Sequence, residues 1–143
     1  MNKQAEFTIY QLLHDLPVFG VQVKTFPKGI QEAFEALSKM LDARAKRSYY
    51  GINIPGRDGK MIYHAVAEEA FPGEANKFLC EKLSISKGVY LTASLRDWPN
   101  KTSTIHELFT LLGKDERVDR RKPLVEWYKN KREMLCMVRL RVG

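Results

Sequence analysis

The spacing of apolar residues alternates between a strand-like and a helix-like period along the chain. The segment FTIYQLLHDLPVFGVQVKTF (7–26) alternates and is rich in β-branched and aromatic residues, which is typical of strands. It is interrupted around Asp15–Pro17, where we expect a bulge or a turn. From Ile30 to Leu41 the apolar positions recur every three or four residues, which predicts an amphipathic helix with Pro27 near its start.

A hairpin, a short helix and a strand are predicted next. Residues 49–70, YYGINIPGRDGKMIYHAVAEEA, contain two apolar runs that flank the turn signal PGRDG. Residues 72–83, PGEANKFLCEKL, indicate a short helix, and KGVYLTASLRDW (87–98) is typical of a strand.

The last part of the chain predicts a helix and a second hairpin. In TSTIHELFTLLG, Thr104 and Glu107 have the spacing of a capping box, and Gly113 is placed to end the helix. The segment PLVEWYKNKREMLCMVRLR (123–141) predicts two strands around a polar, charged turn.

These elements form a repeat. A strand, a helix and a hairpin occur in the order 18–26, 30–41 and 49–66, and again in the order 88–98, 104–112 and 124–140. Both helices have the spacing Ile-x3-Phe-x2-Leu. We therefore predict an α+β fold in which a βαββ module is duplicated about a pseudo-two-fold axis, with antiparallel sheets and helices on one side. The half-modules are expected at about 6–70 and 84–142 of one domain (1–143), with a short helical connector at about 72–83.

A glutamate in the last hairpin is out of keeping with its surroundings. Glu126 lies within the apolar strand LVEWY, although glutamate is disfavoured in strands and is seldom buried without a partner. Alternation places Leu124, Glu126 and Tyr128 on one face and Trp127 on the other, toward the core or the opposite surface. The alternative is an edge or surface position for Glu126, paired with a cation of the turn at 129–132.

A duplicated fold leaves a groove between its halves, and ligand pockets favour such junctions. Aromatic residues of the predicted strands are candidates for the pocket wall, and each has core packing as its alternative role. The candidate ligand-binding residues are Glu126, Tyr128, Tyr50, Tyr63, Tyr90 and Trp98.

Composition excludes several classes of protein. No apolar run approaches the roughly 18 residues of a membrane span, and the N-terminus has no secretory signal, so we expect a cytoplasmic protein without membrane contact. The two cysteines form no CxxC pattern and the three histidines have no metal-ligand spacing, so neither a metal nor a cofactor is expected. The net charge is +7, and residues 114–143 contribute +5 of it through ten basic and five acidic residues. The run GKDERVDRRK is interpreted as a solvated loop or as a contact for an anionic partner, and no motif for specific nucleic-acid binding accompanies it.

Several segments carry a resemblance to a known family: FPKGIQEAFEAL, YYGI, KGVYLTASLRDW, TIHELF, and above all VEWY followed by MLCM. Over nearly its whole length the chain resembles the gyrase-inhibitor-like (GyrI-like) effector-binding domains of bacterial multidrug-responsive transcription regulators. The resemblance implies a duplicated βαββ fold. It also places the central glutamate of the family on Glu126, followed by Tyr128, in an aromatic pocket that faces cationic, lipophilic ligands.

We therefore expect a module that binds a small amphipathic molecule, cationic or aromatic in character. Burial can raise the pKa of an unpaired carboxyl by several units, and a bound cation would offset that cost. Family regulators carry a DNA-binding module before this domain. The residues that precede the strand at Val18 are too few for a helix-turn-helix, so we expect a stand-alone member without a DNA-binding domain.

Two alternatives remain at this stage, and we favour binding over catalysis. Some stand-alone relatives resemble hydrolases of reactive electrophiles, and here Glu126 would act as the base with Tyr90 or Tyr128 as the donor. The other alternative is a protein partner, a regulator or a topoisomerase, recognised through the basic run at 120–122. The sequence leaves open the identity of the ligand and whether the protein is a monomer or a dimer.

Overall fold

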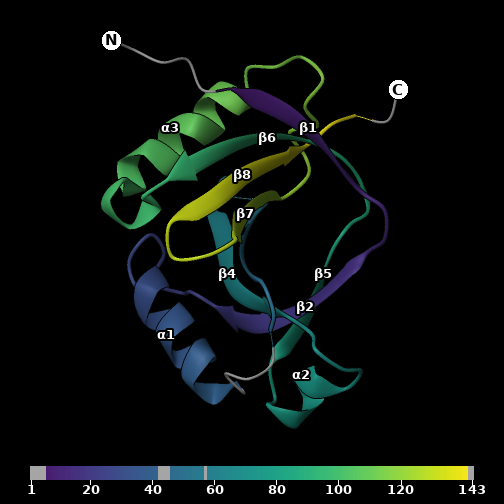
Figure 1. Ribbon diagram of the computed structural model, residues 1–143, viewed down its shortest axis with the longest axis vertical. Helices are drawn as coiled ribbons and strands as arrows, with labels where there is room; N and C mark the ends of the chain where they lie inside the picture. Colours follow the sequence, from purple (N-terminus) through teal and green to yellow (C-terminus); the bar gives the residue numbers. More distant parts are fainter. Residues whose placement is uncertain (1–5, 42–45, 57, 142–143) are drawn as a thin grey trace.

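The structure is a computed structural model that describes residues 6–41, 46–56 and 58–141. In these ranges the chain forms an eight-stranded antiparallel sheet, with helices α1 and α3 on the same side of it (Figure 1). The elements in chain order are β1 (Phe7–Leu12), β2 (Leu16–Gln22), α1 (Ile30–Met40), β3 (Tyr49–Pro55), β4 (Met61–Glu68), α2 (Glu74–Lys77), β5 (Glu81–Ile85), β6 (Gly88–Arg96), the 3-10 helix η1 (Trp98–Asn100), α3 (Thr102–Leu112), β7 (Leu124–Tyr128) and β8 (Glu133–Arg139).

The strand order confirms the predicted duplication. The sheet runs β1-β6-β8-β7-β3-β4-β2-β5, so the series β2-α1-β3-β4 and β6-α3-β7-β8 occupy equivalent positions on either side of the β3–β7 pair. The pseudo-two-fold axis passes between β3 and β7. The α+β fold with two βαββ units and helices on one side is therefore present.

The two edge strands are exchanged between the units. β1 precedes the first unit but pairs with β6 of the second, and β5 precedes the second unit but pairs with β2 of the first. The interruption predicted around Asp15–Pro17 lies at residues 13–15, between two strands that have different neighbours, and Pro17 already belongs to β2. β5 lies partly within the segment 72–83, where the sequence predicted only a helical connector with α2.

Apolar side chains fill both faces of the sheet. On the helix side, Leu37 of α1 packs with Phe19, and Leu112 of α3 packs with Met134. On the opposite side, a separate cluster contains Val125 together with residues of β2, β3, β4, β6 and β8. Because both faces are covered near the centre, the strands there are rich in buried apolar residues rather than strictly alternating.

Helix α3 begins earlier than its sequence pattern suggests. Its first residue is Thr102, Lys101 occupies the N-cap position, and no side chain caps it. The predicted capping box of Thr104 and Glu107 is therefore wrong, since both residues lie inside the helix, whereas Gly113 is the C-cap as predicted. The turn PGRDG includes residue 57, which lies outside the described residues. No helix in the described ranges has the length and apolar character that crossing a membrane requires.

Candidate functional site

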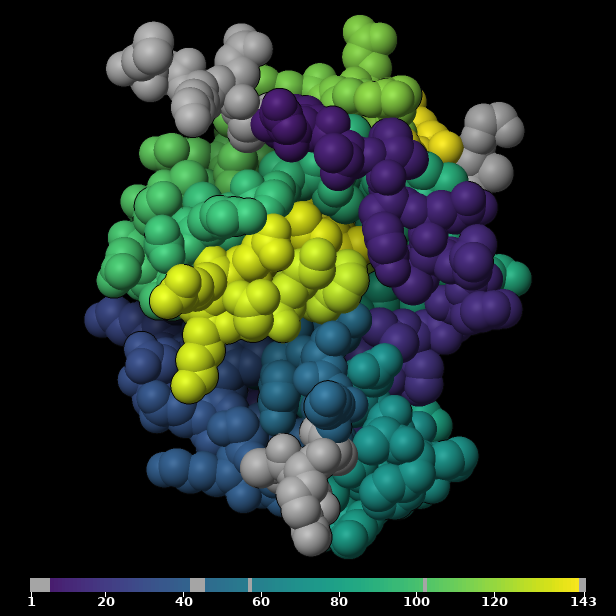
Figure 2. Space-filling model, in the orientation of Figure 1, coloured from purple at the N-terminus to yellow at the C-terminus, as the bar shows by residue number. Residues whose placement is uncertain are grey.

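Glu126 lies on β7, beside the pseudo-two-fold axis and on the face that carries the helices. Its cross-strand neighbours are Gly51 on β3 and Cys136 on β8, both of which have small side chains. Leu124 and Tyr128 share this face, while Trp127 packs on the other, as alternation predicts. In the space-filling view, the yellow β8 segment lies between the green α3 region and the blue α1 region (Figure 2).

Two tyrosine hydroxyls hold the carboxylate of Glu126. Tyr63 on β4 and Tyr128 on β7 each donate a hydrogen bond to Oε1, and the bond from Tyr128 is 2.7 Å long. Burial raises the pKa of the Glu126 carboxyl above its ordinary value, and the two hydrogen bonds oppose this effect because they favour the charged form. Burial also raises the pKa of both phenols, so both remain protonated donors.

Gly51 makes the contact between Tyr63 and Glu126 possible. The two residues lie on strands that are separated by β3, where Gly51 pairs with Glu126 on one side and with Ala65, two residues from Tyr63, on the other. A Cβ atom at Gly51 would collide with both the Tyr63 hydroxyl and Glu126 Oε1. A glycine within a strand often marks such a close approach.

Aromatic rings surround the two tyrosines. Phe26, before α1, stacks on Tyr63 with ring centres 5.1 Å apart. Tyr128 has Phe34 of α1 on its edge at 5.2 Å and Trp98 of η1 at 4.8 Å. Phe34 and Trp98 belong to different units, so Tyr128 joins the two halves of the molecule at this point.

The carboxylate of Glu126 has no cationic partner among the described residues. The alternative suggested by the sequence was an ion pair with a cation of the turn at 129–132. Lys129 instead places its Nζ 5.1 Å from the centre of the Trp127 ring, on the opposite face of the sheet. Among the described residues, the Glu126 carboxylate is therefore stabilised by hydrogen bonds from neutral groups and not by a cation.

The structure places four of the predicted site residues together and two elsewhere. Glu126, Tyr63 and Tyr128 are in direct contact, and Trp98 reaches the group through Tyr128. Tyr50 lies on the opposite face, where its ring stacks on Trp127 at 6.0 Å.

Tyr90 is also remote from Glu126. It belongs to the same opposite-face cluster as Tyr50, and its hydroxyl donates to the carbonyl of Ser86 at 2.5 Å. A cavity of only 20 Å³ lies beside Tyr50 on that face, room for about one water molecule. Three further contributors, Gly51, Phe26 and Phe34, were not singled out by sequence reasoning.

A larger cavity of 270 Å³ lies beyond Leu124, at the end of the β3–β7 pair. Glu126 lines neither this cavity nor the small one. Among the described residues, no group of three or more acidic, histidine or cysteine side chains is arranged to hold a metal. The polar chemistry at the junction is thus a carboxylate, two phenols and their aromatic neighbours.

Solved structures share this fold, although their sequences differ widely from that of this chain. An integron cassette protein from the mobile metagenome of Vibrio cholerae aligns with a TM-score of 0.69 at 15% identity, covering 96% of this chain and 97% of its own. The protein SAV2435, solved with bound tetraphenylphosphonium, aligns with a TM-score of 0.69 at 14% identity, covering 95% and 94%. A hydrolase from Listeria innocua aligns with a TM-score of 0.56 at 13% identity, covering 98% and 94%. No protein-family profile and no curated protein matches the chain, so these likenesses establish the fold alone.

Proposed function

We propose that this protein binds a lipophilic organic cation at the junction of its two units, with Glu126 as the counter-charge. The observation that carries the proposal is a half-buried carboxylate that, among the described residues, accepts hydrogen bonds from two tyrosine hydroxyls and meets no cation. A cation would favour the ionised form of Glu126 and so offset the cost of burying it. The resemblance to GyrI-like effector-binding domains, and the phosphonium ligand of SAV2435, point to the same ligand class.

The aromatic surroundings suit such a ligand. A cation over the face of a tyrosine or tryptophan gains about 0.5–2 kcal/mol, more when it is desolvated. Trp98, Phe34 and Tyr128 are half-buried and come from separate elements, and the rings of Trp98 and Phe34 both pack against that of Tyr128. Tyr63 is 1% exposed and stacked on Phe26, which makes it the fixed part of the site. Tyr128 is then the side chain that moves to admit a ligand.

The test is calorimetric titration of the protein with tetraphenylphosphonium and with the neutral analogue triphenylphosphine oxide. We expect a micromolar Kd for the cation, equivalent to about −8 kcal/mol. Glu126→Gln keeps the acceptor for the tyrosine hydroxyls but removes the charge, so it should weaken cation binding at least tenfold and leave the neutral analogue unaffected. Glu133→Gln, in the same hairpin, is the matched control, because Glu133 is bonded to Ser94 rather than to this site.

The pH dependence gives a second readout. Only the ionised carboxylate attracts a cation, so binding to wild type should strengthen as the pH rises through the raised pKa of Glu126. The Glu126→Gln variant should lack this dependence. Equal affinity of wild type and Glu126→Gln for tetraphenylphosphonium at every pH would refute the electrostatic role.

The same geometry favours a second candidate, the hydrolysis of reactive electrophilic molecules. Ionised Glu126 could activate water as a base, and the hydroxyl of Tyr63 or Tyr128 could donate to a leaving group. Tyr90, the donor considered from the sequence, lies on the opposite face. Incubation of the protein with a panel of epoxides and activated esters, followed by mass spectrometry, separates the two candidates: a binder returns each compound intact, whereas a hydrolase consumes it and Glu126→Gln does not.

A further inference from the structure

We propose a second site: the cavity at the end of the β3–β7 pair binds a small amphipathic anion, such as a medium-chain carboxylate. The cavity has a volume of 270 Å³. This volume is slightly below the roughly 300–1,000 Å³ of pockets for drug-sized ligands, so the ligand must be small.

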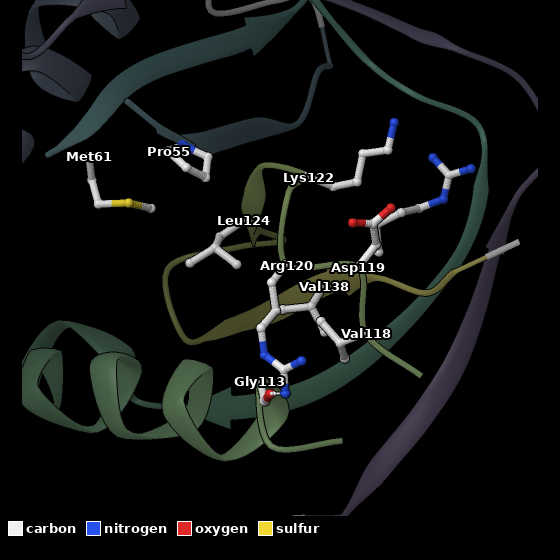
Figure 3. Close-up of a pocket in the computed structure, with 10 residues that line it drawn as sticks. Pro55, Met61, Gly113, Val118, Asp119, Arg120, Lys122, Leu124 and Val138 are labelled. Carbon is white, nitrogen blue, oxygen red and sulfur yellow. Dashed lines mark hydrogen bonds between the residues drawn. The ribbon is translucent and has the colours of Figure 1, made fainter. Parts of the chain in front are cut away.

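Both units contribute to the wall of this cavity (Figure 3). Pro55 and Met61 come from the first hairpin and lie on one side of Leu124, whereas Val118 and Val138 lie on the other. Val118 and Val138 are buried, and Leu124 is half-buried. An alkyl or aryl group on this floor would gain roughly 25 cal/mol for each Å² of apolar surface removed from water.

The rim of the cavity is basic. Arg120 and Lys122 both line it, and the connection from α3 to β7 carries both of them. Arg120 donates through Nη2 to the carbonyl of Gly113, which orients its guanidinium along the end of α3 (Figure 3). A guanidinium and an ammonium beside an apolar floor favour a ligand that has a carboxylate at one end and a hydrocarbon at the other.

The other charged groups of the wall do not cancel this preference. Asp119 accepts hydrogen bonds from the backbone and the side chain of Arg121, at 3.1 and 3.2 Å, and these bonds lower the pKa of its carboxyl. Arg139 directs its guanidinium to the Tyr90 ring, 5.7 Å from the ring centre. Arg120 and Lys122 are therefore the groups that would meet an anion.

This site is adjacent to the Glu126 site but has the opposite charge preference. Leu124 precedes Glu126 by two residues on the same face of β7, which is about 7 Å along a strand. The proposal does not depend on cation binding at Glu126. It also gives a role to the basic run that the sequence left as a solvated loop or an anion contact.

Three probes of equal chain length test the proposal: octanoate, octanol and octylammonium. Their binding to the intact protein is measured by calorimetry and by methyl NMR. We expect wild type to bind octanoate at least tenfold more tightly than octanol, and octylammonium most weakly. The double variant Arg120→Gln/Lys122→Gln should lose the advantage of octanoate over octanol. The double variant Lys131→Gln/Arg132→Gln is the matched control, since both residues are exposed and neither lines the cavity. It should behave as wild type.

Chemical shifts identify the place of binding. Octanoate should perturb the methyl groups of Val118, Leu124 and Val138, and Glu126→Gln should bind octanoate within about twofold of wild type. Equal binding of octanoate and octanol by wild type would overturn the proposal, as would no binding of octanoate at millimolar concentration or perturbation confined to other methyl groups. These comparisons need no substitution in the cavity, so they decide the matter even if the double variant fails to fold.

Discussion

Two glutamates of this protein, the buried Glu74 and the half-buried Glu126, stand in surroundings that shift the pKa of the carboxyl in opposite directions. Glu74, at the start of α2, forms a two-pronged ion pair with Arg47 at 2.7 and 2.8 Å, with both side chains 3% exposed. Hydrogen bonds from Arg47 lower the pKa of the Glu74 carboxyl. Among the described residues, the hydrogen bonds to Glu126 come from two phenols, and burial raises its pKa.

The contrast separates a structural carboxylate from a candidate ligand-binding one. The counter-charge of Glu74 is part of the fold, and the backbone N–H of Ala70 adds a further hydrogen bond at 2.9 Å. Glu126 has the same chemistry without a cation among the described residues. Buried charge alone therefore indicates nothing about function, whereas a buried charge without an internal partner leaves room for an external one.

The largest expected effect concerns the ion pair. Glu74→Gln should lower the free energy of unfolding by about 3–5 kcal/mol at pH 7, because Arg47 keeps its buried charge beside a neutral amide. Urea denaturation at neutral pH measures this loss. Glu126→Gln, the same chemical change, should cause no comparable loss, and an equal loss in both variants would remove the distinction.

Gly51→Ala should have the next largest effect. The added methyl group collides with the Tyr63 hydroxyl and with Glu126, so we expect a loss of about 1–3 kcal/mol in unfolding free energy and weaker phosphonium binding. Gly113→Ala is the control, because its Cβ would lie 3.3 Å from the nearest atom, in a right-handed helical conformation. Denaturation of both variants is the measurement, and a Gly51→Ala protein with wild-type stability would contradict the close approach.

The pH dependence of stability should differ in sign between the two glutamates. The folded pKa of Glu126 is raised, so wild type loses stability relative to Glu126→Gln as the pH rises from the unfolded pKa to the folded one. The folded pKa of Glu74 is lowered, so its contribution is present above the unfolded pKa and is lost as the pH falls. Between the two pKa values of either group the slope is about 1.4 kcal/mol per pH unit. Urea midpoints from pH 3 to pH 8 measure both, and slopes of the same sign would contradict the comparison.

Removal of one phenol should have the smallest effect. Tyr128→Phe deletes a donor that favours ionised Glu126, so the pKa of Glu126 should rise further. Carbon NMR of labelled glutamate carboxyls follows the titration. Tyr50→Phe, on the opposite face, should leave the Glu126 titration unchanged. A fall in the pKa of Glu126 in Tyr128→Phe would show that the hydroxyl does not stabilise the charge.

Sequence reasoning reached some features of this site and not others, for identifiable reasons. Alternation along β7 suffices to place Glu126 with Tyr128 and apart from Trp127, because the strand period is fixed. The face occupied by Tyr50 depends on the register between β3 and β7, which pairs Gly51 with Glu126, and periodicity within one strand does not contain that register.

The two exchanged strands also depend on pairing between strands, which the sequence pattern of a single segment does not contain. The segment EKLSI of β5 is short and mixed in polarity, and only its pairing with β2 makes it a strand. The start of helix α3 was missed for a similar reason. It lies at Thr102 because the chain enters the helix directly from η1, and no side-chain cap marks the position. The repeat itself was accessible from sequence, because it depends on element order and not on pairing.

The exchange of edge strands holds the two units together, because each unit provides a strand that pairs with the sheet of the other. β1 completes the sheet of the second unit and β5 completes that of the first, so neither half can swing away without stripping a strand from its partner. One continuous sheet with exchanged edge strands disfavours hinged closure, the common way in which paired lobes enclose a ligand. A ligand that binds between the two units must therefore be accommodated by movement of side chains. Such a site selects ligands by charge and size more than by detailed shape.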